Sequence, residues 1–209
     1  MIQDIWPKHL DNQYKNLKPG NEDTVFYFQG SSLLARPSGH FNSQNPEENV
    51  LIYPQYDEFV QGIKSSYGDK AVDNFEFIYL LSIDEEHFFL ARKTGSLERG
   101  TFLGEMADSA VHKDMYSFVR GYEFIGVDSF RKAQPREHAY AAITAFHLYG
   151  WYRDNHFCGR CGKPLKHDDK QRMLRCDCCK NMVFPKICPA VIVAVTDKDR
   201  ILLTKYAGR

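Results

Sequence analysis

The cysteines constrain this chain more than any other residue type. None occurs before residue 158, and all six lie between Cys158 and Cys188. Four of them form two pairs with the same spacing, Cys158 with Cys161 and Cys176 with Cys179. Two thiolates separated by two residues can bind one metal ion, and two such pairs complete a tetrahedron. The sequence therefore predicts a four-cysteine zinc site.

The predicted site has the features of a structural zinc. Gly159 and Gly162 surround the first pair and allow backbone conformations that larger residues resist. The stretch between the two pairs is too short to form a core of its own, so metal binding would hold it folded. Four protein ligands leave no position for water. We expect a closed zinc ribbon, with one zinc per chain and no catalytic role for the metal.

Other interpretations of the cysteines stay open. A redox dithiol or an iron site would use the same four residues. Cys178 could replace Cys176 or Cys179, although the two-residue spacing favours Cys176 with Cys179. Cys178 is then a free surface thiol, and Cys188, inside an apolar run, is a small core residue.

The charge balance excludes several classes of protein. The 209 residues include 27 basic and 27 acidic ones, so no net positive field attracts nucleic acid or anionic membranes. No apolar run approaches the length of about 18 residues that spans a membrane. Residues 1–18 are polar and lack the apolar stretch of a secretory signal. We expect a cytoplasmic protein without membrane contact.

Residues 1–134 predict a mixed α and β domain. Thr24–Gln29 is β-branched and aromatic, which is typical of a strand. Phe75–Ser82 and His87–Arg92 flank the polar Ile83–Glu86 and predict a hairpin. Tyr122–Val127 predicts a further strand.

Two weaker patterns lie between these strands. Gly39–Asn49 is rich in Gly, Asn, Ser and Pro and predicts an exposed loop. Residues 104–119 allow a helix, because Met106, Ala110, Val111 and Met115 are spaced along one face.

A long helix is predicted over Pro135–Arg153, with Glu137 near its positive end. We expect residues 135–156 to link the first domain to a zinc ribbon at 157–185. The apolar positions recur near the helical period, at Ala139, Ile143, Phe146, Tyr149 and Gly150.

Residues 186–209 predict two apolar strands. Ile187–Val195 is almost wholly apolar, as in a strand buried on both faces. Thr196–Asp199 supplies a turn, and Arg200–Lys205 the second strand. An isolated hairpin is marginal in water, so we expect these strands to open a further domain.

The order of motifs from Trp151 onward resembles that of the NADH pyrophosphatase family of Nudix hydrolases. The motifs are the paired cysteines, then Phe184-Pro185 and Pro189-Ala190, then Arg200-Ile-Leu-Leu. The resemblance covers about residues 140–206 and is loose over residues 1–130. It implies an α+β chain: a mixed, Nudix-like N-terminal domain, a four-cysteine zinc ribbon, and the opening β-strands of a truncated α/β/α Nudix domain.

The resemblance also implies an activity. Such enzymes use Mg²⁺ or Mn²⁺ to hydrolyse the pyrophosphate of NADH or NAD⁺, giving NMN(H) and AMP. Some members remove NAD caps from RNA, and many are homodimers. The catalytic carboxylates of the Nudix box, a glycine followed by an Arg-Glu…Glu-Glu arrangement, do not occur in residues 1–209. We therefore expect a fragment without catalytic residues that does not hydrolyse NADH.

Two residues correspond to family positions near substrate. Phe184 stands where members often have a tyrosine beside the nucleotide base, so it keeps a stacking face and lacks the hydroxyl. Arg131 aligns loosely with an arginine assigned to substrate contact. A solvated surface arginine is the alternative for Arg131.

A different class of function is a non-catalytic zinc-ribbon module that binds protein or nucleic acid. The ribbon has local positive charge, which Asp168, Asp169 and Asp177 interrupt. The basic residues are Lys163, Lys166, Lys170, Arg172 and Arg175.

Overall fold

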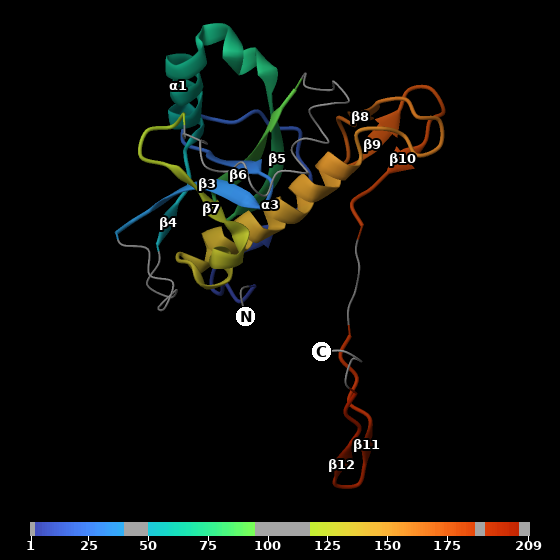
Figure 1. The fold of residues 1–209 in the computed structure, drawn as a ribbon. Helices are drawn as coiled ribbons and strands as arrows, with labels where there is room; N and C mark the ends of the chain where they lie inside the picture. The colour runs from blue at the N-terminus through green and yellow to red at the C-terminus, as the bar shows by residue number, and fades with distance from the viewer. Residues whose placement is uncertain (1–2, 40–49, 95–117, 187–190, 205–209) are drawn as a thin grey trace.

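The described part of the chain, residues 3–39, 50–94, 118–186 and 191–204 of a computed structural model, combines α and β structure as the sequence predicts (Figure 1). The larger sheet has seven strands in the order β1-β5-β6-β2-β3-β4, with β7 paired to β3. Among the described strands of this sheet, only β2 and β6 run parallel. Its strands are β1 (Leu10–Asp11), β2 (Thr24–Gln29), β3 (Ser32–Pro37), β4 (Leu51–Ile52), β5 (Phe75–Ile83), β6 (Glu86–Lys93) and β7 (Glu123–Gly126).

The predicted strands and hairpin of this sheet are confirmed, with one difference at the hairpin turn. The turn between β5 and β6 has two residues, Asp84 and Glu85, because the strands continue to Ile83 and Glu86. Asp84 has a φ of 51°. Aspartate tolerates this left-handed conformation better than most residues, so it allows the shorter turn.

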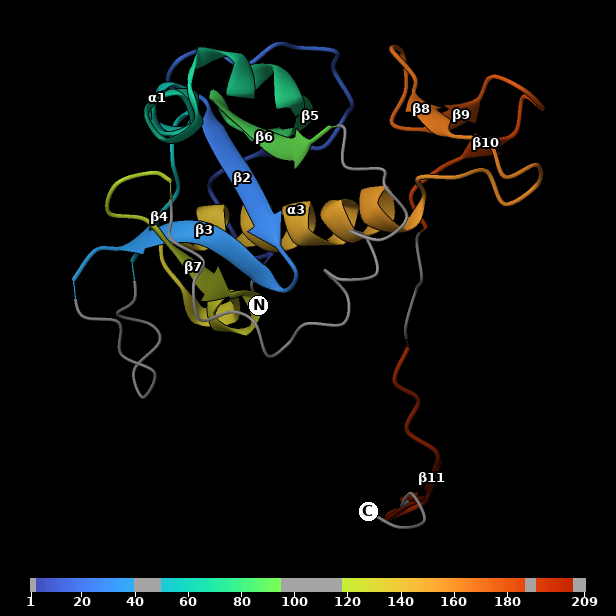
Figure 2. The ribbon, with the colours of Figure 1, turned by 45° about the horizontal axis from the view of Figure 1, so that its top comes forward.

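Two helices cover opposite faces of the sheet, α1 (Tyr56–Tyr67) and α3 (Arg136–Asp154) (Figure 2). Alternation along β2 supplies both cores: Val25 packs in the cluster that includes α1, and Phe26 in the cluster that includes α3. The short 3₁₀ helices η2 (Asp69–Asn74) and η3 (Val127–Lys132) precede β5 and α3. The sheet is therefore buried on both faces.

The predicted helix over Pro135–Arg153 is confirmed within one residue at each end, but a different face is most buried. Of the predicted apolar positions, Ala139 is buried, whereas Ile143, Phe146 and Tyr149 are only partly buried against the core. Small side chains let the helix backbone lie close to the sheet, so the alanine-rich face packs inward. The buried residues of α3 are Ala139, Ala141, Ala142, Ala145, Leu148, Trp151 and Tyr152.

The cysteine region forms a second, three-stranded sheet at the C-terminal end of α3 (Figure 2). Its order is β10 (Met182–Val183), β9 (Leu174–Cys176), β8 (Leu165–His167). Leu174 is 2% exposed and belongs to the same core cluster as α3 and the large sheet. The ribbon is thus packed onto the N-terminal part.

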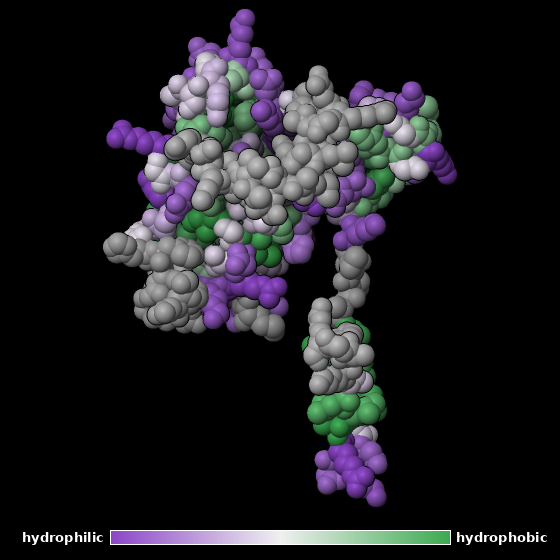
Figure 3. Space-filling model, in the orientation of Figure 1, coloured by the Kyte–Doolittle hydropathy of each residue, from purple (hydrophilic) through white to green (hydrophobic). Residues whose placement is uncertain are grey.

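The apolar strand predicted over Ile187–Val195 is wrong for its described residues. Residues 191–195 form no strand and are exposed, Ile192 fully so. Only short strands follow, β11 (Thr196–Asp197) and β12 (Arg200–Ile201), which pair with each other. The large apolar side chains described in this segment are all more than half exposed, as expected for a hairpin that packs on no larger core (Figure 3).

Some predictions lie outside the described residues. They are the loop over residues 40–49, the helix at 104–117, and the apolar positions 187–190 with Cys188. In the segments that are described, no helix has both the length and the apolar character needed to cross a membrane.

Candidate metal centre

The two cysteine pairs sit in turns with the same backbone pattern. In the first, the Gly162 N–H donates to the Cys158 carbonyl at 2.8 Å, and in the second the Lys180 N–H donates to the Cys176 carbonyl at 2.9 Å. Gly162 and Lys180, each next to the second cysteine of its pair, have φ of 69° and 59°. The glycine marked the first turn in the sequence, whereas no residue marked the second.

These turns bring the four predicted cysteines together. Their sulfur atoms all lie within 4.8 Å of one another. Cys158 Sγ is 3.5 Å from Cys179 Sγ, and Cys161 Sγ is 3.4 Å from Cys176 Sγ. A tetrahedron with Zn–S bonds of about 2.3 Å has S···S edges of about 3.8 Å. The four thiols therefore fit a metal ion such as zinc, with each turn contributing one pair.

The four cysteines differ in burial and in how readily each thiol ionises without a metal. Cys158 and Cys176 are 2% and 0% exposed, while Cys161 and Cys179 are half-buried. Burial opposes ionisation of Cys158, but backbone N–H groups of Arg160 and Cys161 and the neighbouring thiols outweigh it and lower the pKa of Cys158 to about 6. Backbone N–H donors also lower the pKa of Cys176. Cys161 and Cys179 each have a backbone N–H donor as well, but burial and hydrogen bonds with neighbouring thiols raise their pKa. A thiolate is the form that binds metal.

Cys178 lies outside this group. Its side chain is exposed, although it is the neighbour of Cys179 in the chain. The alternative in which Cys178 replaces Cys176 or Cys179 therefore has no support from the arrangement of the four sulfur atoms.

A junction joins the ribbon to the large sheet and to α3. The Arg172 guanidinium donates to the Leu80 carbonyl of β5. Tyr152 Oη of α3 lies 2.7 Å from His167 Nε2, and His167 Nδ1 lies 2.8 Å from the Asp168 carbonyl. A carbonyl only accepts, so Nδ1 carries the proton, and in the neutral ring Nε2 accepts from Tyr152. Burial lowers the pKa of His167, which favours the neutral ring.

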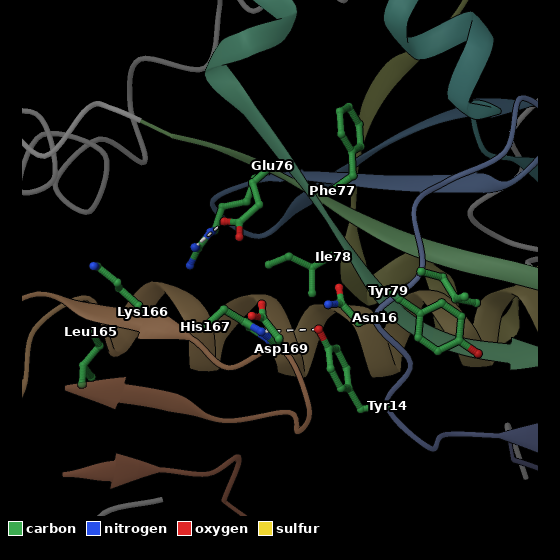
Figure 4. Close-up of a pocket in the computed structure, with 12 residues that line it drawn as sticks. Tyr14, Asn16, Glu76, Phe77, Ile78, Tyr79, Leu165, Lys166, His167 and Asp169 are labelled. Atoms are coloured by element: carbon green, nitrogen blue, oxygen red, sulfur yellow. Dashed lines mark hydrogen bonds and ion pairs between the residues drawn. The ribbon is translucent and has the colours of Figure 1, made fainter. Parts of the chain in front are cut away.

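A cavity of about 380 Å³ opens beside this junction, between β5 and β8 (Figure 4). Glu76 and Arg92 form an ion pair of 2.6 Å at one side. The Arg92 guanidinium also lies 5.2 Å from the centre of the Tyr152 ring. His167, the Tyr14 hydroxyl and Asp169 lie at the other side in Figure 4. Apart from His167, the cavity is lined by two acidic side chains, Glu76 and Asp169, and two basic ones, Arg92 and Lys166, so these charges favour neither a cation nor an anion.

The structure does not bring the two predicted substrate contacts together. Arg131 is exposed in η3, just before α3 begins. Phe184 follows β10 in the ribbon and is 49% exposed. The ribbon meets the C-terminal end of α3, and a helix of 19 residues is about 28 Å long. The two side chains therefore occupy separate surfaces.

Sequence reasoning missed the junction residues. The sequence pattern places Arg172 among the basic residues of the ribbon, and nothing in it marks Tyr14 or His167. A contact such as Arg172 to Leu80 joins residues 92 positions apart, and no local pattern encodes it. The alternation around Leu174 in β9 was the only available sign that the ribbon has a buried side.

Comparison with known proteins adds an independent observation. No family model matches the chain. The NAD-capped RNA hydrolase NudC of Pseudomonas aeruginosa is 38% identical over 55 residues, which are 26% of this chain and 20% of that protein. The protein of the same name from Salmonella typhi is 36% identical over 59 residues, 28% of this chain and 23% of that protein.

The resemblance to the NADH pyrophosphatase family is confirmed. The similarity is limited to a part of each protein, because the matched segment spans about a fifth of the length of these curated relatives. The hydrolases named there act on NAD-capped RNA.

Proposed function

We propose that the chain is part of a Nudix-type enzyme that hydrolyses the pyrophosphate of NADH or NAD⁺ to NMN(H) and AMP and that can also remove NAD caps from RNA. The similarity to NAD-capped RNA hydrolases carries this proposal. The fit of four thiols to a single metal ion supports it, because a zinc ribbon is what the family resemblance implies.

The zinc in this proposal is structural. Cys158, Cys161, Cys176 and Cys179 supply four ligands, so no coordination position is left for water. Zinc would hold the two turns together, and the proposed chemistry needs a separate Mg²⁺ or Mn²⁺ bound by carboxylates that polarise the pyrophosphate. Those carboxylates do not occur in the 209 residues, and we expect this chain alone to be inactive.

The proposed organisation follows the same resemblance. Residues 1–134 form a Nudix-like domain, 135–156 a linking helix, 157–185 the ribbon, and 186–209 the first strands of the catalytic domain. The exposed apolar side chains at 191–203 support the last assignment, since strands of that composition need partners. We further propose a cytoplasmic homodimer in which Phe184 and Arg131 contact the nucleotide; because the two side chains lie on separate surfaces of one chain, the arginine would have to come from the other protomer.

The alternative, a ribbon that binds nucleic acid or protein by its basic residues, has less support. Lys166 Nζ lies 2.6 Å from an Asp177 carboxylate oxygen. Arg172 is occupied at the Leu80 carbonyl. Two of the five basic side chains therefore already have partners within the protein.

The experiment is a turnover assay on the protein encoded by the complete gene, beside the 209-residue chain. With Mg²⁺ or Mn²⁺, the complete protein should convert NADH to NMNH and AMP, and the shorter chain should not. Product separation by chromatography measures both. A complete gene that encodes no Nudix box, together with salt-sensitive binding of RNA by the ribbon, would favour the alternative instead.

A further inference from the structure

The loop between the two cysteine pairs has contacts at both its ends and its middle. Its ends are Cys161 and Cys176, which belong to the two metal-binding turns. His167 and Arg172 lie between them and contact the N-terminal part of the chain. A metal ion and the large sheet would therefore order the same short loop from opposite sides.

The contact made by Arg172 is at the edge of the large sheet. β1 pairs with β5 only at Ser82 and Ile83, so the Leu80 carbonyl lies just beyond the end of this pairing. The Arg172 guanidinium donates to that carbonyl and lies 5.9 Å from the centre of the Tyr14 ring. The hydrogen bond is charge-assisted and half-buried, which makes it stronger than an exposed one.

The contact made by His167 is to the helix. Tyr152 is fully buried, and its hydroxyl donates to His167 Nε2. The opposite nitrogen is held by the Asp168 carbonyl, which fixes the ring. Side chains facing His167 from the other elements are Tyr14, Glu76 of β5, Arg92 of β6 and Arg172.

The loop loses conformational entropy when it becomes ordered. Either metal binding or docking on the sheet and helix can order it first. If the loop is already docked on the sheet and helix, less conformational entropy is lost when a metal ion binds the cysteines. Such coupling between two binding events is reciprocal: docking must strengthen metal binding by the same factor by which the metal strengthens docking.

We propose that docking of Arg172 and His167 on β5 and α3 raises the zinc affinity of the four-cysteine site. Neither residue belongs to the group of possible ligands, so both act as positioning residues. The proposal concerns metal binding by this chain and is independent of whether NAD(H) is hydrolysed.

The test compares Arg172→Ala with Lys170→Ala, which removes an exposed positive charge from the same loop. Zinc dissociation constants are measured by competition with a chromophoric chelator. Loss of a hydrogen bond from a charged donor should raise the constant about tenfold in Arg172→Ala. Lys170→Ala should match the wild type. Cobalt absorption should keep the same band positions in all three, because the four thiolate ligands are unchanged.

Because the coupling is reciprocal, the effect of zinc on β5 can be measured as well. A variant that merely lowered overall stability would not change this effect of zinc. In the wild type, zinc should slow amide hydrogen exchange in β5, and in Arg172→Ala this slowing should be much smaller. Tyr152→Phe removes only the hydroxyl that reaches His167 and serves as a second, milder variant with the same expected direction.

Equal zinc affinity in the wild type, Arg172→Ala and Tyr152→Phe would overturn the proposal. So would a zinc effect on β5 exchange that is the same with and without Arg172. A chain that binds neither zinc nor cobalt would overturn it together with the metal site itself.

Discussion

Replacing Cys176 with serine should remove the metal and loosen the ribbon, while the same replacement at Cys178 should do neither. The two positions are separated by one residue and receive the same chemical change. Cys176 is fully buried and lies 3.4 Å from Cys161 through its sulfur, whereas Cys178 is exposed and outside the group of four. The pair therefore separates loss of a ligand from loss of a thiol.

The magnitude follows from the loop that the metal closes. Cys161 and Cys176 are joined through the metal across a loop of about 15 residues, and a cross-link of that length contributes about 3 kcal/mol by reducing the entropy of the unfolded chain. For a chain of this size, each kcal/mol shifts the melting temperature by about 2 to 4 °C. We expect Cys176→Ser to melt about 6 to 12 °C lower and Cys178→Ser to melt with the wild type.

Elemental analysis and a thermal scan by circular dichroism measure both effects. The wild type and Cys178→Ser should contain about one zinc per chain, and Cys176→Ser close to none. Retention of zinc by Cys176→Ser, or its loss from Cys178→Ser, would refute the assignment of ligands. A folded wild type purified without any metal would refute the site as a whole.

Three further perturbations test other features of the structure. Phe88 is fully buried, so Phe88→Ala should lower the free energy of unfolding, measured by urea denaturation, by about 3 to 5 kcal/mol. Trp6 is 87% exposed, so Trp6→Ala should change the same free energy by less than about 0.5 kcal/mol. Ile192→Asp should leave the melting temperature of this chain unchanged, since Ile192 is fully exposed; a clear shift would mean that residues 191–195 are packed. Burial lowers the pKa of His167, so below about pH 6.5 the unfolded chain binds a proton that the folded chain does not. At saturating zinc, the free energy of unfolding should therefore decrease more steeply in the wild type than in His167→Gln as the pH is lowered below about 6.5.

Local patterns predicted the elements that depend on neighbouring residues. The strand over Thr24–Gln29 agrees with the structure at both ends, and the long helix agrees within a residue. The cysteine pairs were found by spacing alone, because each turn of the metal site is formed by consecutive residues. Such features need no knowledge of the rest of the fold.

Features that depend on distant residues could not be predicted in this way. The apolar run at Ile187–Val195 indicated a buried strand, but burial requires a surface to pack on, and the described residues of the run have none. The most buried face of α3 is its alanine side. Alanine has a small apolar side chain, so a search for large apolar residues gives it little weight, whereas close packing of a helix on a sheet favours it. The junction through Arg172 joins two parts of the chain by a single side chain and leaves no periodic signal.

The one parallel pair of the large sheet bears on the order in which the protein can form during synthesis. Thr24 of β2 lies opposite Phe88 of β6, and these residues are about 64 positions apart. β2 and β3 can pair as soon as both are made, as can β5 and β6, because each is a hairpin of consecutive strands. The two hairpins join only after β6 has left the ribosome, and until then Phe26 lacks the Phe88 ring on which it stacks. A nascent chain therefore exposes one edge of β2 throughout the synthesis of the residues between β2 and β6.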